Sequence, residues 1–221
     1  APANAVKADL AALGNSYYTM SYSSVTSYQS FNGYDLVIWV RGDVYPTSYQ
    51  NMSTTYQNAI SGYIDNLNGN VILMWPGPVY MSGANTMFNR MGVQNCSWWT
   101  SGNNPPLYMA IQSNYVPYNG PGGNGVTQLT SSISSYGQPL MLSVGSDLRS
   151  GYKGVFGWMS SPTGYLQGIA YDNGTAGDHL GWGMWVGGWG GWDTNNGSTP
   201  STPGRKGVLW NLIEAIDPNY I

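Results

Sequence analysis

The sequence predicts an α/β fold, with a mostly parallel sheet flanked by helices and an irregular, β-rich second half. Residues 35–40 and 71–75 are continuous apolar runs, which is typical of strands that helices cover on both faces of a parallel sheet. Between them, apolar residues keep a helical spacing from Ser48 to Leu67. This strand–helix–strand order predicts a βαβ unit with a right-handed crossover.

The other elements follow from local signals. Residues 2–13 predict a helix, because Pro2 suits a first turn and Gly14 follows as a stop. Residues 16–21 are rich in tyrosine and strand-like, and Asn68-Gly69 predicts a turn before the second strand. A short helix is expected over 83–91, further strands over 107–112, 140–144, 155–159, 166–171 and 184–188, and a last helix after Thr202-Pro203. No linker divides the chain, so residues 1–221 are predicted to form a single domain.

Charge is scarce in this chain of 221 residues: 8% of them are charged and the net charge is −3, against about 25% charged residues in an ordinary domain. The absence of a Lys/Arg cluster argues against a nucleic-acid surface. No apolar run approaches the ~20 residues that span a bilayer. Aromatic residues make up 14% of the chain, which argues against disorder.

The polar residues favour an extracellular or cell-surface location. Solubility must come from neutral Ser, Thr, Asn, Gln, Gly and Tyr. Such a surface loses little of its hydrogen-bonding capacity when carboxylates protonate in acid. Four Asn-x-Ser/Thr sequons predict N-linked glycans, at Asn51, Asn95, Asn173 and Asn196. The start Ala-Pro-Ala carries no signal peptide, so any such peptide is expected to have been removed already.

Four stretches carry a resemblance to a known family. Residues 34–43 and 69–74, with the helix between them, resemble the non-catalytic glutamine-amidotransferase-like (flavodoxin-like) domain of secreted microbial proteases and surface proteins. Residues 204–213 look like its closing helix, and residues 167–172 resemble a late strand. The resemblance implies a flavodoxin-like sheet. Catalytic relatives carry a Cys after a central strand, whereas residues 75–78 here read Trp-Pro-Gly-Pro, so the family's reaction is not expected.

The resemblance also implies a missing strand. In that family a strand at the middle of the sheet precedes the first helix, and this sequence starts with the helix. A central gap would leave two rows of backbone groups unpaired. A strand donated by a neighbouring subunit would fill it, as would a cleaved segment that stays bound. The alternatives are a trimmed domain boundary and a chain that closes its sheet differently.

Few residues suggest chemistry. Cys96 is the one cysteine of the chain, which excludes an intrachain disulfide and a Cys-based zinc site. His179 is the one histidine. Asp43 and the pair Asp147 and Arg149 follow strand ends, where α/β sheets place ligands. They form either an acid–base or cation site or simple ion pairs, such as Asp43 with Arg149 or Arg41 with Asp147. No glycine-rich loop leads into a helix, so no nucleotide or flavin cofactor is expected.

The stretch from Gly181 to Trp192 sets four tryptophans among glycines: Trp182, Trp185, Trp189 and Trp192. Exposed tryptophans bind a partner or a sugar, and glycines let another backbone come close. A tryptophan-rich core strand is the alternative.

Three functions remain open. The first is a non-enzymatic extracellular structural protein of a microbe from a hot or acidic habitat, which self-assembles into a filament or surface layer through donated strands. The second is an accessory domain of a secreted protease that binds carbohydrate or packs on its catalytic partner. The third is a hydrolase that uses Asp43, Asp147 and His179.

Overall fold

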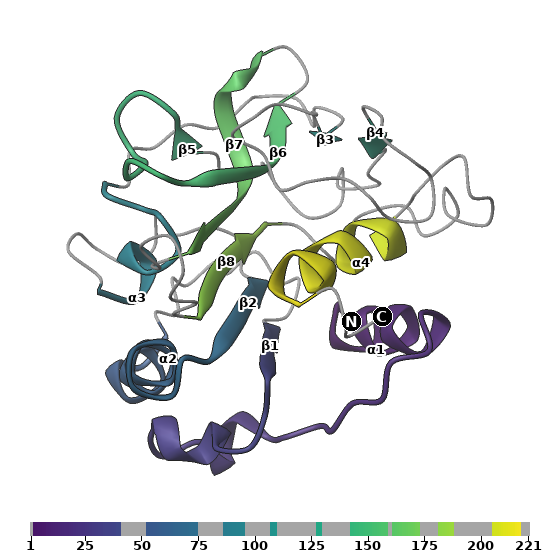
Figure 1. The fold of residues 1–221 in the computed structure, drawn as a ribbon, viewed down its shortest axis with the longest axis vertical. Coiled ribbons are helices and arrows are strands. Elements are labelled where there is room, and N and C mark those ends of the chain that lie inside the picture. The colour runs from purple at the N-terminus through teal and green to yellow at the C-terminus, as the bar shows by residue number, and fades with distance from the viewer. Residues whose placement is uncertain are drawn as a thin grey trace, which may run out of the picture.

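The computed structural model has helices on both faces of one eight-stranded sheet (Figure 1). The structure describes residues 2–40, 52–74, 86–95, 107–109, 127–129, 142–158, 161–172, 181–187 and 205–217. The α-helices are α1 (Pro2–Ala12), α2 (Thr54–Leu67), α3 (Thr86–Asn89) and α4 (Arg205–Ile216), and two 3₁₀ turns are η1 (Tyr22–Ser24) and η2 (Tyr28–Phe31). The strands are β1 (Leu36–Val40), β2 (Asn70–Met74), β3 (Leu107–Met109), β4 (Thr127–Leu129), β5 (Leu142–Ser143), β6 (Lys153–Trp158), β7 (Ser161–Asp172) and β8 (Trp182–Val186).

The sheet is mixed rather than mostly parallel, so that part of the prediction was wrong. Its order is β1-β2-β8-β7-β6-β3-β4, with β5 paired to β7. The pairs β1–β2 and β2–β8 are parallel, and the other five described pairs are antiparallel. The α/β class and the parallel β1-α2-β2 unit are confirmed.

The gap expected at the middle of the sheet is absent from the described strands. Hydrogen bonding continues from β1 through β2 and β8 to β4, because the first two strands pair directly, Leu36 with Asn70 through Val40 with Met74. No gap therefore interrupts the described strands, and the missing strand stays a prediction. The consequence is that β1 stands at one end of the strand order.

Helix α2 carries the local signals that made the βαβ unit predictable from the sequence. The Ser53 hydroxyl caps its first turn by accepting a hydrogen bond from the Tyr56 amide. Its apolar stripe places Ile60, Tyr63 and Ile64 in the core. Asn68 then adopts a left-handed φ of 50°, which ends the helix in the predicted turn.

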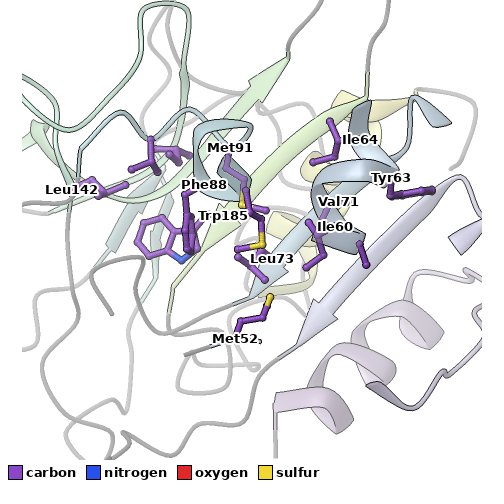
Figure 2. Packing of buried hydrophobic residues seen from close by; sticks show 14 of the residues in the cluster. Met52, Ile60, Tyr63, Ile64, Val71, Leu73, Phe88, Met91, Leu142 and Trp185 are labelled. Atoms are coloured by element: carbon purple, nitrogen blue, oxygen red, sulfur yellow. The ribbon is translucent and has the colours of Figure 1, made fainter. Parts of the chain in front are cut away.

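Alternate residues of the central strands point into two cores. Ile72 and Met74 of β2 face α1 and α4 on one side, whereas Val71 and Leu73 face α2 and α3 on the other. Figure 2 shows the second core around Trp185, whose side chain is fully buried. Because both faces of β2 are covered, its apolar run has no polar interruption.

Two glycines permit close backbone approaches at the start of β8. A Cβ atom on Gly181 would lie 1.8 Å from the carbonyl oxygen of Gly69, and one on Gly183 would lie 2.1 Å from that of Arg90. These close approaches are between segments of one chain, so the expected contact with a partner at this stretch stays a prediction.

Candidate functional site: the free edge of strand β1

Strand β1 is paired on one edge only among the described strands. Its sequence is Leu-Val-Ile-Trp-Val, and all five residues are half-buried. Proteins usually protect an edge strand with lysine, proline or a bulge, because its open row of N–H and C=O groups can pair with another chain. Strand β1 contains no lysine or proline and its register with β2 is regular, so this edge is unprotected by such devices.

A groove of about 520 Å³ runs beside this edge. Leu36, Ile38 and Val40 line it from β1, and helix α1, residues 15–20, residues 33–35 and Ile213 of α4 supply the rest of its lining. Val6 and Leu10 of α1 belong to the first core and are no more than 8% exposed. The groove therefore has an apolar base formed by packed helices.

Residues 16–20 form an extended wall of this groove. The prediction of a strand over residues 16–21 was wrong, because these residues join no described sheet. Figure 1 shows the backbone between α1 and η1 as a drawn-out connection. None of these five residues hydrogen-bonds to another residue in the part of the chain that the structure describes. At the start of this wall, the side-chain nitrogen of Asn15 is buried and also has no hydrogen-bond partner there. Such a buried donor is costly unless an acceptor reaches it.

Exposed aromatic side chains gather at the groove. Tyr17, Tyr18 and Tyr34 line it and are 46%, 72% and 38% exposed. The rings of Tyr18 and Tyr34 stack with their centroids 6.1 Å apart. Lys7 and Asp35 are the two charged residues of the lining, so its formal charge is zero. Exposed apolar and aromatic surface of this kind is typical of a contact site.

The tryptophan-rich stretch divides between core and undescribed residues. Trp185 is fully buried in the second core, opposite Leu73 and Ile169 of the neighbouring strands, so it is unavailable as a surface contact and fits the core alternative. Trp182 is partly buried against the first core. Trp189 and Trp192 lie outside the described residues.

Asp147 has a structural role in the turn that follows β5. Its side chain is fully buried, and its carboxylate accepts hydrogen bonds from the Ser143 amide at 2.7 Å and the Ser146 hydroxyl at 3.1 Å. Its carbonyl oxygen accepts from the amides of Gln94 and Asn95. A carboxylate committed to such contacts is poorly placed for catalysis.

Arg149 binds the end of α3. Its Nη1 donates to the carbonyl and side-chain oxygens of Asn89, at 2.9 and 3.0 Å, and its guanidinium lies 4.6 Å from the ring centre of Tyr171. The other candidates for chemistry, Arg41, Asp43, Cys96 and His179, lie outside the described residues.

Replacing Asp147 by alanine is expected to lower the free energy of unfolding by about 1–3 kcal/mol, because the Ser143 amide and Ser146 hydroxyl lose their acceptor. Chemical denaturation measures the difference. The matched control is Ser150→Ala, an exposed residue nearby, which should change stability by less than about 0.5 kcal/mol. Equal midpoints for the two variants would contradict the structural role.

Of the four sequons, the structure describes Asn95. This residue is exposed, and its side-chain nitrogen donates to the Ser146 carbonyl at 3.0 Å. Asn51, Asn173 and Asn196 lie outside the described residues, so glycosylation at all four sites stays a prediction.

Within the described ranges, no three His, Cys, Asp or Glu residues are grouped as a metal ion would require. Over the same ranges, no helix combines the length and apolar character needed to cross a bilayer. No protein-family model matches the chain, and neither a curated protein nor a solved structure is significantly similar to it. The resemblance to glutamine-amidotransferase-like domains therefore stays a prediction.

Sequence reasoning missed the groove because its parts are far apart in the chain. The available signal was local: two adjacent tyrosines, Tyr17 and Tyr18, occur in a strand-like segment. Aromatic residues that find no place in a core often mark a contact surface.

Proposed function

We propose that this protein is a non-enzymatic, extracellular structural protein that self-assembles through strands shared between subunits. The observation that carries the proposal is the apolar edge of β1, with which no described strand pairs. Sheet edges recruit extended chains by main-chain hydrogen bonding. If successive copies join head to tail in this way, the contact need not close, and a filament or surface layer results.

Other features support this proposal. The scarcity of charge, 8% of residues, weakens electrostatic repulsion between copies. The parallel β1-β2-β8 segment with helices on both faces supports the flavodoxin-like arrangement of a glutamine-amidotransferase-like domain. The burial of Asp147 argues against the hydrolase alternative that uses it.

An accessory domain of a secreted protease that binds carbohydrate is the second candidate. The exposed rings of Tyr17, Tyr18 and Tyr34 favour it, because aromatic faces pack against the apolar faces of sugars. Titration with oligosaccharides, followed by intrinsic fluorescence, tests this candidate.

The mass of the native particle tests the principal proposal. Light scattering at acidic and neutral pH, over a series of protein concentrations, is expected to give masses well above the 23.9 kDa of one chain. Assembly is expected to persist in acid, because few carboxylates are available to protonate. A monomer under all these conditions would overturn the structural proposal and favour the accessory domain.

A further inference from the structure

The groove beside β1 has the form of a slot for one extended peptide. One wall is the edge of β1 that no described strand pairs with. Another wall is the extended segment 16–20, which makes no hydrogen bond within the described part of the chain. A peptide lying in the slot can therefore exchange backbone hydrogen bonds with β1, and residues 16–20 offer further unused donors and acceptors. The Asn15 side-chain nitrogen, buried and unpaired, would gain an acceptor.

The lining defines the chemistry of that peptide. At the base lie Val6, Leu10 and Ile213, all nearly buried, so alternate side chains of the incoming strand should be apolar. Lys7 and Asp35 balance each other in formal charge, so the strand should be neutral. Tyr18 is largely exposed at the groove and can cover the outward side of a bound strand.

We infer that this slot receives an extended strand from a second copy of the same chain. The inference rests on the proposed function, and it names the acceptor site that assembly would use. A copy of this chain fits the neutral lining, because only 8% of its residues are charged, against about 25% in an ordinary domain. Every copy also presents the same edge, with which no described strand pairs, and such an edge invites uncontrolled pairing when it is left open.

Amide hydrogen exchange at low and high protein concentration tests the location of the contact. On assembly, the amides of residues 16–20 are expected to exchange at least about tenfold more slowly, and protection should extend to the edge-facing amides of residues 36–40. The exposed residues 21–24, which lie outside the groove lining, should change less than about twofold and serve as the internal reference.

Two tyrosine variants form a matched pair for the same test. Tyr18 and Tyr22 are 72% and 67% exposed, and each makes a ring contact, with Tyr34 and Tyr56 respectively. Tyr18 lines the groove and Tyr22 does not. Tyr18→Lys should raise the concentration for half-assembly at least about tenfold, whereas Tyr22→Lys should raise it less than about twofold. Both variants should keep the unfolding midpoint of the parent chain, because neither side chain is buried.

Each remaining outcome overturns this inference in a recognisable way. Assembly with protection elsewhere, and with equal effects of Tyr18→Lys and Tyr22→Lys, would leave self-assembly standing and reject the slot. A monomer at every concentration would reject both. Protection of residues 16–20 in a monomer would assign the slot to a segment of the same chain, and protection that follows added oligosaccharide would assign it to a sugar.

Discussion

Replacing Trp185 by alanine is expected to lower the free energy of unfolding by about 3–5 kcal/mol. The indole is fully buried on the central strand β8, and its loss leaves a cavity between two sheet neighbours and the helices of the second core. Because domains are stable by only about 5–15 kcal/mol, this single change should remove a large share of the stability.

Chemical denaturation followed by circular dichroism measures the effect without depending on tryptophan emission. Tyr22→Ala, at a ring that is 67% exposed, is the control and should change stability by less than about 0.5 kcal/mol. A Trp185→Ala chain as stable as the parent would show that this side chain is a surface group, and would return it to the candidate contact residues.

The second large effect is expected for Gly181→Ala. The new methyl carbon would lie 1.8 Å from the carbonyl oxygen of Gly69 and 2.8 Å from that of Asn68. Both are backbone atoms, which cannot rotate away as a side chain can. In the variant, the segments that lead into β2 and β8 must therefore separate. This separation would strain the hydrogen bond from the Trp182 amide to the Asn70 side chain, which is 2.9 Å long in the parent chain. The expected loss is about 3 kcal/mol or more, at the upper end for overpacking.

Gly145→Ala is the matched control, because a Cβ atom there meets nothing within 4 Å. Its unfolding midpoint should stay within about 0.5 kcal/mol of the parent. Similar midpoints for the two alanine variants would contradict the close packing between Gly181 and Gly69.

The first half of the fold was predictable because its signals are local and strong. The apolar run of β1, the helical spacing of α2 and the turn at Asn68 each depend on neighbours within a few residues. The observed bounds of these elements differ from the predicted ones by a residue or two, apart from the start of α2, where Ser53 caps a helix that begins at Thr54 instead of Ser48.

The direction of the later strands was harder to predict. A strand's own sequence does not fix whether its neighbour runs parallel or antiparallel. One signal was available: the strands predicted over 155–159 and 166–171, which prove to be β6 and β7, leave only residues 160–165 between them, and a connection that short joins antiparallel strands. Strand β4 was missed because three residues, Thr127–Leu129, are too few to show an alternation.

The candidate groove depends on contacts between distant segments, which no local pattern contains. Residues 16–20 looked like a strand, and whether such a segment is paired depends on which strand folds beside it. In the tryptophan-rich stretch a local pattern was present but ambiguous. The composition of the stretch is typical of a contact site, yet Trp185 within it is buried in the core.

The position of β2 between β1 and β8 also constrains the order in which the chain can fold. Its first partner, β1, precedes it by one helix, but its second partner, β8, begins 112 residues after Asn70. During synthesis the β1-α2-β2 unit emerges with the apolar edge of β2 still open, and closing so long a loop is slow. The growing chain is therefore most prone to aggregate before residue 186 is made.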